Sequence, residues 1–354
     1  MIGSDKRLLE FDKQPFESTK WSWIEDVVDT RDPGFIHDIG RAALGTRWVF
    51  LCEGSGLRES GDFFTDEIAG HLVLICRNEA GVLNGFRNVC LHLGAPVERN
   101  RHGRTRSFIC PYHAWVFALD GKLNGVAMPE GYEGTGFQKE DFRLPEIPVT
   151  NVGSLVFGST ADDPGDPAAN FAEVQPYLAG LFPDGTSWDI IFNCNLRVDL
   201  GWAEWMKRSR AAYAEGKVAG SLLGLSAQAY GSQCELTETS SGHQVALFRG
   251  TDLAGLERRY GIKRTAAWGK GRARFLEEKA YAGCVLHVAP NLVIGAMGDS
   301  IATLRVDPLD EGISMIRIQG YGRQAEDPAL RQARLQQLQL WWGPGSEQVH
   351  LLSQ

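Results

Sequence analysis

The sequence predicts an α+β protein in which an antiparallel β domain is followed by a mixed domain. Two observations support this prediction. Residues 46–159 contain short strand-like runs joined by Gly-rich turns, with no helical periodicity between them. Residues 160–354 instead combine helical segments with longer strand-like runs. The turn-rich stretch STADDPGDPAAN, at residues 159–170, separates the two patterns and is predicted to be a linker.

The chain before the β domain is predicted to be helical. Residues 1–45 include the amphipathic stretch PGFIHDIGRAAL, and Trp21 and Trp23 add aromatic bulk. This N-terminal helical segment is expected to pack on the C-terminal domain.

Short strands follow one another through the β domain. GHLVLICRN is predicted to be a strand that returns as LNGFRNV after the turn EAGV. Asp120 and Gly121 form a second turn, between two further strands. The remaining strand-like runs are SFIC, AWVFAL, KLNGV and GSLVFGS.

Helices flank the strands of the C-terminal domain. GWAEWMKRSRAAYAEGK is predicted to be a helix, and DPALRQARLQQLQLWWG is a second one. Asp327 can cap the second helix, Pro328 suits its first turn and Gly343 ends it. The strands between the helices are predicted at QVALFRG, CVLHVAPNLVIGAMG, ATLRVDPL and ISMIRIQGYG.

Composition narrows the class of protein. The chain has 354 residues, of which 43% are hydrophobic and 23% charged, as in globular domains. Its net charge of -8 and the absence of a long Lys/Arg run argue against nucleic acid as a partner. The charged start MIGSDKRLLEFDKQ does not resemble a signal peptide, and the longest apolar run, AWVFAL, is too short to span a membrane. We therefore expect a cytoplasmic protein with no membrane association.

The seven cysteines are not expected to form disulfides in such a protein, because cytosolic thiols are kept reduced. Cys284 and His287 share a Cys-x-x-His spacing, but residues three apart on a strand point to opposite faces, so this pair is a poor chelate. The cysteines predicted to be buried small hydrophobes are Cys52, Cys76, Cys194, Cys234 and Cys284.

Two short motifs indicate a metal centre. Cys90 and His92 flank one residue, Cys110 and His113 flank two, and seventeen residues separate the pairs. Zinc sites commonly group Cys with Cys and His with His, whereas each pair here is mixed. Mixed pairs suit a two-iron cluster in which one iron takes both thiolates and the other both imidazoles. The spacing therefore predicts a Rieske-type [2Fe–2S] centre, with zinc as the alternative.

The flanking residues resemble Rieske-type oxygenases. CPYHAWVFALDGKL is similar to their second cluster loop, C-P-Y-H-G-W, and NVCLHLGAP to their first, N-x-C-x-H-R-G-A. The match departs at Leu93 and Ala114, and His102 between the loops is expected to be solvated. The resemblance covers nearly the whole chain. It implies an oxygenase α subunit with an antiparallel β Rieske domain, a helix-grip domain whose curved sheet surrounds a helix, and a reductase or ferredoxin as electron donor.

The resemblance also implies a mononuclear Fe(II) site, held by two histidines and a carboxylate. The family carries the histidines on one helix, in a pattern like D-x-x-H-x-x-x-x-H. In VDLGWAEWMKRSRAAYAEG, Glu204 takes the acidic position, while Lys207 and Ala212 take the histidine positions. No histidine occurs from residue 114 to residue 242. Mononuclear iron is therefore predicted to be absent.

Some residues of the site have alternatives. Glu347 is the best match for the third ligand, a carboxylate near the chain end, and another frame places Val349 or His350 there. Lys207 either occupies the place of the iron, between buried carboxylates, or reaches solvent. A triad rebuilt from His243, His287 and His350 is the less favoured alternative, because each is expected to be an ordinary strand or core histidine.

These expectations define a function. In the family, α subunits form trimers, and the cluster of one subunit passes electrons to the iron of its neighbour. We expect this chain to be an electron-relay or structural partner of a catalytic α-type homologue, in a hetero-oligomer acting on an aromatic or polycyclic substrate. The alternatives are a catalytic mono- or dioxygenase with an unusual ligand set, and a non-enzymatic redox or ligand-binding protein on the same scaffold.

Overall fold

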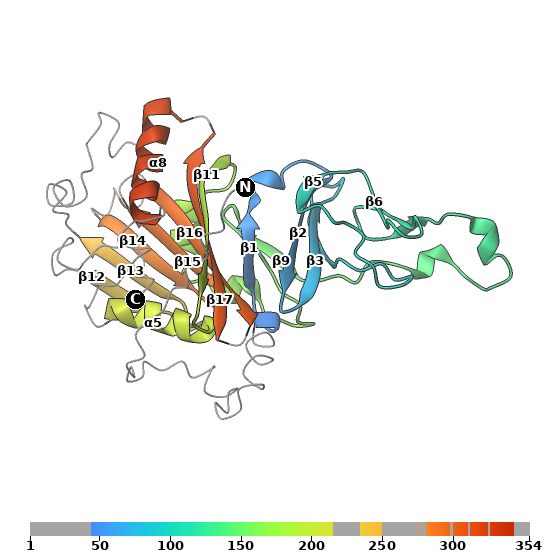
Figure 1. Ribbon diagram of the computed structural model, residues 1–354, viewed down its shortest axis with the longest axis horizontal. Coiled ribbons are helices and arrows are strands. Elements are labelled where there is room, and N and C mark those ends of the chain that lie inside the picture. Colours follow the sequence, from blue (N-terminus) through green and yellow to red (C-terminus); the bar gives the residue numbers. More distant parts are fainter. Residues whose placement is uncertain are drawn as a thin grey trace, which may run out of the picture. The chain divides into compact units, whose positions relative to one another are not determined.

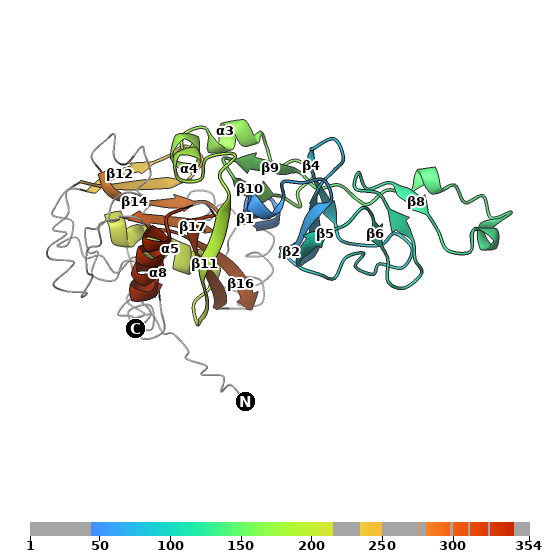
Figure 2. The ribbon, with the colours of Figure 1, turned by 90° about the horizontal axis from the view of Figure 1, so that it is seen from above.

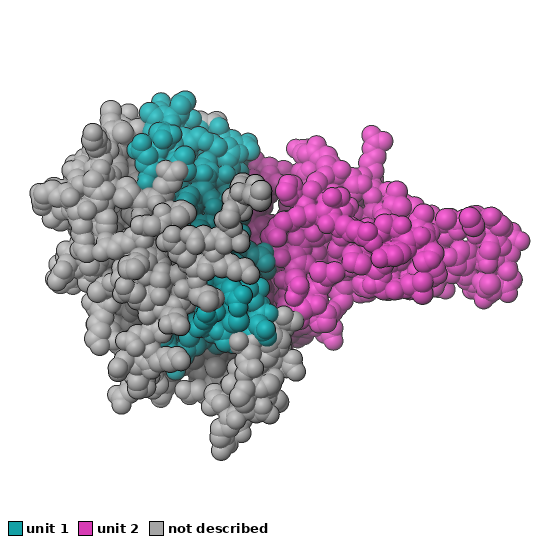
Figure 3. All heavy atoms as spheres, viewed as in Figure 1, with its two compact units in different colours: residues 1–40, 170–354 teal, residues 41–169 magenta. Residues whose placement is uncertain are grey.

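A computed structural model describes residues 44–214, 234–249, 276, 281–297, 300–310, 312–324 and 326–342. They fall into two compact units that meet in sequence between residues 169 and 170, at the end of the predicted linker (Figure 3). The first unit described here, residues 41–169, is labelled unit 2 in Figure 3, and the second, residues 1–40 and 170–354, is labelled unit 1. Nearly all of the predicted N-terminal helical segment, residues 1–45, lies outside the described residues.

Three small antiparallel sheets build the first unit (Figure 1). A four-stranded sheet has the order β4-β3-β2-β5 and places β5 at an edge. Its strands are β2 (Asp62–Ile68), β3 (His71–Arg77), β4 (Leu83–Arg87) and β5 (His102–Arg104). The other two sheets are β6 (Phe108–Ile109), β7 (Val116–Phe117) and β8 (Leu123–Gly125); and β1 (Val49–Glu53), β10 (Leu155–Gly158) and β9 (Val149–Val152). Three short 3-10 helices complete the unit: η1 (Gly54–Gly56), η2 (Pro129–Tyr132) and η3 (Lys139–Asp141).

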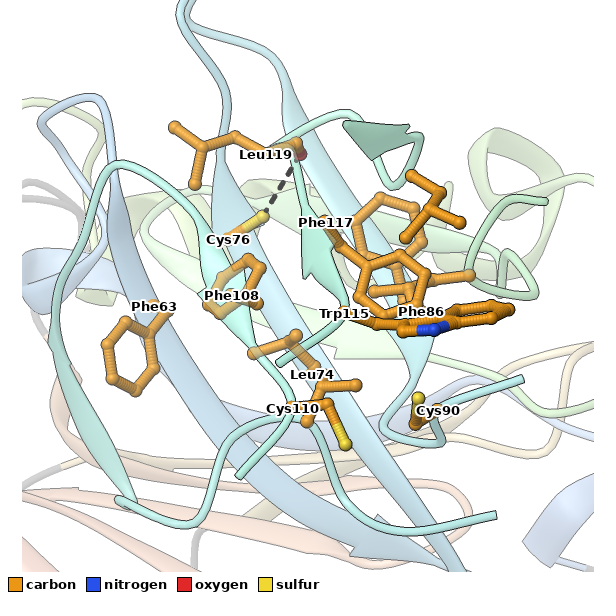
Figure 4. Packing of buried hydrophobic residues seen from close by; sticks show 13 residues of the cluster. Phe63, Leu74, Cys76, Phe86, Cys90, Phe108, Cys110, Trp115, Phe117 and Leu119 are labelled. Atoms are coloured by element: carbon orange, nitrogen blue, oxygen red, sulfur yellow. Dashed lines mark hydrogen bonds between the residues drawn. The ribbon is translucent and has the colours of Figure 1, made fainter. Parts of the chain in front are cut away.

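Aromatic side chains fill the core of this unit (Figure 4). Phe63 and Phe108 meet edge to face, with ring centroids 5.7 Å apart, and so join β2 to β6. The thiol of Cys76 donates to the carbonyl of Leu119 at 3.4 Å. Cys90 and Cys110 belong to the same buried cluster, which places the predicted cluster thiolates at the edge of the core.

A seven-stranded antiparallel sheet forms the second unit, in the order β11-β17-β16-β15-β14-β13-β12. From β12 to β17, each strand pairs with the next one in the sequence, whereas β11 pairs with β17. The strands are β11 (Trp188–Val198), β12 (Cys234–Glu238), β13 (Gln244–Arg249), β14 (Tyr281–Val288), β15 (Leu292–Met297), β16 (Ser300–Asp310) and β17 (Ile313–Arg323).

Helices cover both faces of this sheet (Figure 2). The helices are α3 (Pro167–Phe171), α4 (Gln175–Leu181), α5 (Trp202–Ala214) and α8 (Pro328–Trp342). Leu338 of α8 packs on Gly320, and Ser209 of α5 reaches His287, which by strand register lies on the same face. Tyr321, of opposite parity to Gly320, packs against Phe182 after α4. The predicted α+β class, with a β domain followed by a sheet that holds helices, is confirmed.

Some local predictions were confirmed and others were wrong. Asp327 caps α8, because its Oδ1 accepts the backbone N–H of Ala329 at 2.8 Å. Cys76 and Cys284 are buried, and burial raises the pKa of each thiol to about 12. Cys234 was predicted to be buried but is exposed, because β12 is an edge strand. Cys52 and Cys194 are half-buried.

The contact of α8 with β17 gives a first prediction. A Cβ added at Gly320 would lie 2.4 Å from Cδ1 of Leu338, a fully buried residue of α8. We expect Gly320→Ala to destabilise the protein by about 1–3 kcal/mol, as overpacking of a core does. Gly201→Ala is the control, because its nearest neighbour would be 3.9 Å away. Thermal unfolding of both variants measures the difference, and equal midpoints would contradict the packing.

Candidate metal centre

Two backbone turns of the same form carry the four predicted ligands. In the first turn, the Gly94 N–H donates to the Cys90 carbonyl at 2.8 Å, and the Cys90 N–H donates to the Ala95 carbonyl at 2.6 Å. In the second, Ala114 donates to Cys110 at 3.0 Å, and Cys110 donates to Trp115 at 2.9 Å. The two loops are therefore related by a shift of twenty positions along the chain.

The fifth residue of each turn has a left-handed backbone. Gly94 has φ +79° and Ala114 has φ +52°. A left-handed residue reverses the chain tightly, which lets the carbonyl of the Cys accept from the residue four positions on. Ala114 departs from the glycine of the resembling family, and its Cβ makes this conformation costly.

The turns bring like ligands together. The thiols of Cys90 and Cys110 lie within hydrogen-bonding contact, and both residues are buried. The rings of His92 and His113 meet edge to face, with centroids 4.5 Å apart. Among the residues that the structure describes, no three His, Cys, Asp or Glu side chains surround a single point. The ligands thus form a sulfur pair and an imidazole pair, as a two-iron cluster requires.

The free polar atoms of these residues fit such a cluster. His92 Nδ1 is buried and has no hydrogen-bond partner among the described residues, which is the state of an atom that a metal would occupy. Burial raises the pKa of the Cys90 thiol, while backbone N–H groups of His92 and Leu93 donate to its sulfur and lower that pKa. Those donors would stabilise the thiolate that a metal needs.

An aromatic wall fixes one of the imidazoles. The His92 ring stacks on Trp115, with centroids 5.1 Å apart and planes 8° from parallel. Trp115 is itself held, because its indole N–H donates to the Tyr132 hydroxyl at 3.0 Å and Phe142 packs edge to face against it. The position of His92 is therefore set by packing even without metal.

Asn88 closes the first loop, a role that the sequence did not reveal. Its side-chain oxygen accepts the backbone N–H groups of Val97 at 3.0 Å and Glu98 at 3.1 Å. Its amide donates to the Glu98 carbonyl at 2.8 Å. The side chain is buried and ties together the two ends of the segment that holds Cys90 and His92. Asn88 belongs to the N-x-C-x-H motif, so the motif includes the residue but does not show that it closes the loop.

Comparison with known proteins identifies the domain. The Rieske [2Fe-2S] domain family matches residues 47–134, which include both loops. Residues 47–134 are a Rieske domain. The resemblance predicted from the cluster loops is thereby confirmed.

Relatives of the chain are named as oxygenase subunits. It is 36% identical over 128 residues to the terephthalate 1,2-dioxygenase terminal oxygenase subunit alpha 2 of Comamonas sp, a match covering 35% of this chain and 31% of that protein. It is 26% identical over 166 residues to the glycine betaine monooxygenase oxygenase subunit of Chromohalobacter salexigens, covering 47% and 36%. The chain thus matches about a third of the length of these relatives.

A solved structure shares the fold well beyond the Rieske domain. Naphthalene 1,2-dioxygenase from Rhodococcus sp. superposes with a TM-score of 0.72 and 19% identity, over 90% of this chain and 78% of that chain. The fold is therefore that of Rieske oxygenase α subunits, including the helix-grip domain.

The residues aligned with the mononuclear iron site lie mainly on α5. Glu204 Oε1 accepts from Arg208 Nε at 2.7 Å, so it forms an ion pair within the helix. Lys207 is half-buried. Ala212 is on the same helix, with its side chain outside the described atoms, and Glu347 lies outside the described residues.

The buried cation of α5 is Arg210. Its guanidinium donates to the Gly242 carbonyl and lies 3.2 Å from Glu238 Oε1. Burial lowers the pKa of Arg210, and Glu238 raises it. A buried positive charge beside a carboxylate, the role considered for Lys207, is therefore found at Arg210, three residues further along α5.

His243 and His287 have structural contacts. His243 Nδ1 accepts the Ala289 N–H at 3.0 Å, its Nε2 lies 2.9 Å from the Asn170 carbonyl, and its ring stacks on Phe171. His287 Nε2 lies 3.1 Å from Ser209 Oγ. Burial, and then the charge of Arg210, hold the pKa of His287 well below its usual range.

Two other expectations concern exposure and the membrane. His102 is exposed, as predicted, but it lies on strand β5 and not in a loop. Among the helices of the described residues, none has the length and apolar character to cross a bilayer.

The hydrogen bonds of Asn88 give a second prediction. We expect Asn88→Ala to leave the buried N–H of Val97 and the partly buried N–H of Glu98 without an acceptor, at a cost of about 1–3 kcal/mol in loop stability. Iron content per chain should fall. Asn78→Ala is the matched control, because Asn78 makes the same kind of contacts to Ala80 and Val82 in a hairpin turn. Equal iron loading of the two variants would show that Asn88 does not position the loop.

The left-handed backbone of Ala114 gives a third prediction. Ala114→Gly should raise the midpoint of thermal unfolding, because the left-handed conformation costs an L residue about 1–2 kcal/mol and glycine entropy offsets only about half of that. Ala118→Gly serves as the comparison and should lower the midpoint, since no left-handed φ occurs there. A lower midpoint for Ala114→Gly would contradict the strain at this turn.

Proposed function

We propose that this chain is the electron-relay subunit of a hetero-oligomeric Rieske oxygenase. One observation carries the proposal. The cluster ligands Cys90, His92, Cys110 and His113 are all present, whereas Lys207 and Ala212 stand where the resembling family has the histidines of its mononuclear iron. A Rieske cluster accepts and returns one electron. An electron received by this chain then needs an acceptor elsewhere.

The electrostatics of α5 support the loss of the mononuclear site. Arg210 places a buried guanidinium in the layer between α5 and the sheet, and the pKa of His287 is lowered in part by that charge. A divalent cation bound there would meet the same repulsion. His243 is an unsuitable replacement ligand, because binding a metal would break one of its two ring contacts.

A partner supplies what this chain lacks. The acceptor is the mononuclear iron of a catalytic α-type homologue, in a trimer-based assembly where His92 and His113 face the partner. A metal-bound imidazole can donate outward through its second nitrogen, which suits His113 because its side chain is exposed. A reductase or ferredoxin delivers the electron.

The substrate of the assembly is proposed to be aromatic or polycyclic. Relatives named for terephthalate and naphthalene support this class, although a glycine betaine monooxygenase also matches. If this chain were instead a catalytic oxygenase with an unusual ligand set, it would turn over substrate without a homologue. A non-enzymatic redox protein on this scaffold would require no partner.

Metal analysis tests the first part of the proposal. The purified chain should contain about two irons and, when reduced, give the low-average-g electron paramagnetic resonance signal of a Rieske centre. His113→Cys should lose the cluster or lower its reduction potential, because a thiolate adds negative charge. A reproducible third iron that disappears on replacing His243 or His287 would overturn the proposed loss of the mononuclear site.

Asymmetric mutation of a mixed oligomer tests the relay. Cys110→Ser in this chain should lower turnover of the complex with its catalytic homologue by at least about tenfold, because the electron route is cut. Glu204→Gln should change turnover little, since Glu204 pairs within its own helix. A native homotrimer that is active without any homologue would refute the relay.

A further inference from the structure

Three aromatic side chains that follow the second ligand loop converge on Trp115. The ring centroids of Tyr132, Phe137 and Phe142 lie 6.4, 5.7 and 5.2 Å from that of the indole. They also pack on one another, because the Phe137 centroid lies 4.5 Å from that of Tyr132 and 5.0 Å from that of Phe142. Trp115 is only 2% exposed. The indole is therefore held by residues that lie outside both ligand loops.

Trp115 in turn joins the two ligand loops. Its backbone carbonyl accepts the Cys110 N–H at 2.9 Å, which closes the second loop. Its indole stacks on His92 of the first loop, with planes 8° from parallel. The His92 ring also meets His113 of the second loop, with centroids 4.5 Å apart. A turn or shift of the indole would therefore move an imidazole of one loop against that of the other.

One polar contact fixes the orientation of the indole. Trp115 Nε1 donates to the Tyr132 hydroxyl at 3.0 Å, and this N–H has no other acceptor among the residues that the structure describes. Ring packing alone lets an indole turn in its own plane, whereas a directional hydrogen bond does not. Tyr132 is anchored as well, because Thr135 Oγ1 donates to its carbonyl at 2.6 Å.

We infer that Tyr132 is a positioning residue for the metal centre, which acts through Trp115 and His92 to keep the reduction potential of the cluster low. Its hydroxyl contacts Trp115 and none of the four ligand residues among the described contacts. The inference rests on the proposed ligation of the cluster by His92, and it does not depend on the relay role of the chain.

The direction of the effect follows from charge. With two thiolates and two neutral imidazoles, the oxidised two-iron cluster has no net charge, and the reduced cluster carries one negative charge. The face of an indole is negative, so Trp115 stacked on His92 disfavours the added electron. When the Tyr132 hydroxyl accepts the indole N–H, it polarises the ring and makes its face more negative. Loss of this hydrogen bond should therefore raise the potential.

Solvent acts in the same direction. The rings of Tyr132, Phe137 and Phe142 bury the indole and exclude water from that side of His92. Exposure to water raises the potential of a cluster that gains negative charge on reduction, because water stabilises the added charge. An indole that turns away after losing its hydrogen bond would admit water and raise the potential further.

A redox titration of the holoprotein tests the inference. Tyr132→Phe keeps the aromatic ring and removes only the acceptor. It should keep two irons per chain and increase the equilibrium constant for one-electron reduction about threefold, which is about 28 mV. Tyr112→Phe is the matched control, because Tyr112 also lies beside a ligand but is 62% exposed, and its hydroxyl has no hydrogen bond among the described residues. It should keep the wild-type potential.

A double-mutant cycle tests the route through the indole. Trp115→Phe retains an aromatic ring but has no N–H to donate, so adding Tyr132→Phe to it should leave the potential unchanged. An undiminished shift in that background would mean that Tyr132 reaches the cluster by another route and would overturn the inference. The comparison of Tyr132→Phe with Tyr112→Phe decides the question even if Trp115→Phe fails to hold its cluster.

The outcomes also separate this inference from the proposed function. A colourless wild-type protein would refute the cluster itself. A coloured Tyr132→Phe protein with a lower midpoint of thermal unfolding and the wild-type potential would show a purely structural contact and overturn the inference alone. A lowered potential would overturn it as well, because both the charge and the solvent argument require a rise.

Discussion

The metal centre depends on one backbone constraint, the left-handed residue at the fifth position of each ligand loop. Gly94 and Ala114 reverse the chain so that the carbonyl of Cys90 or Cys110 is satisfied within its own turn. With the main chain closed in this way, the side chains of Cys and His are presented on one side and need no helix to support them. The core behind the loops holds the thiols, and the aromatic wall around Trp115 holds one imidazole.

Arginine side chains occur in two settings in this chain. In the first, arginines such as Arg101 and Arg104 are pinned by aspartates at the surface and stay in water. In the second, the side chain of Arg210 is buried, pairs with Glu238 and donates to the Gly242 carbonyl. A surface guanidinium acts on other charges through solvent, whereas a buried one determines which charged groups can be buried next to it. The surface charge of the Rieske domain and the buried charge of α5 are thus separate features of the chain.

Local chemistry could be predicted from the sequence, and long-range contacts could not. The two Cys/His loops were predictable because each Cys and its His lie within one short turn. The helix α8 was predictable because Asp327, Pro328 and the helix periodicity act locally. The edge position of β12, which exposes Cys234, follows from strand order rather than composition. Asn88 and Arg210 were missed because their roles depend on partners ten and twenty-eight residues away in sequence.

The twenty-position shift between the two loops holds for the cysteines and for the turn residues, but not for the histidines. His92 is the third residue of its turn and His113 is the fourth of its own. The third position of the first turn faces the indole of Trp115, whereas the fourth position faces solvent in both turns, as exposed Leu93 and His113 show. This single-residue offset gives the two imidazoles different surroundings: the half-buried ring of His92 packs on Trp115, whereas the side chain of His113 is exposed. Two loops of nearly the same backbone thus hold one imidazole by packing and leave the other open to solvent.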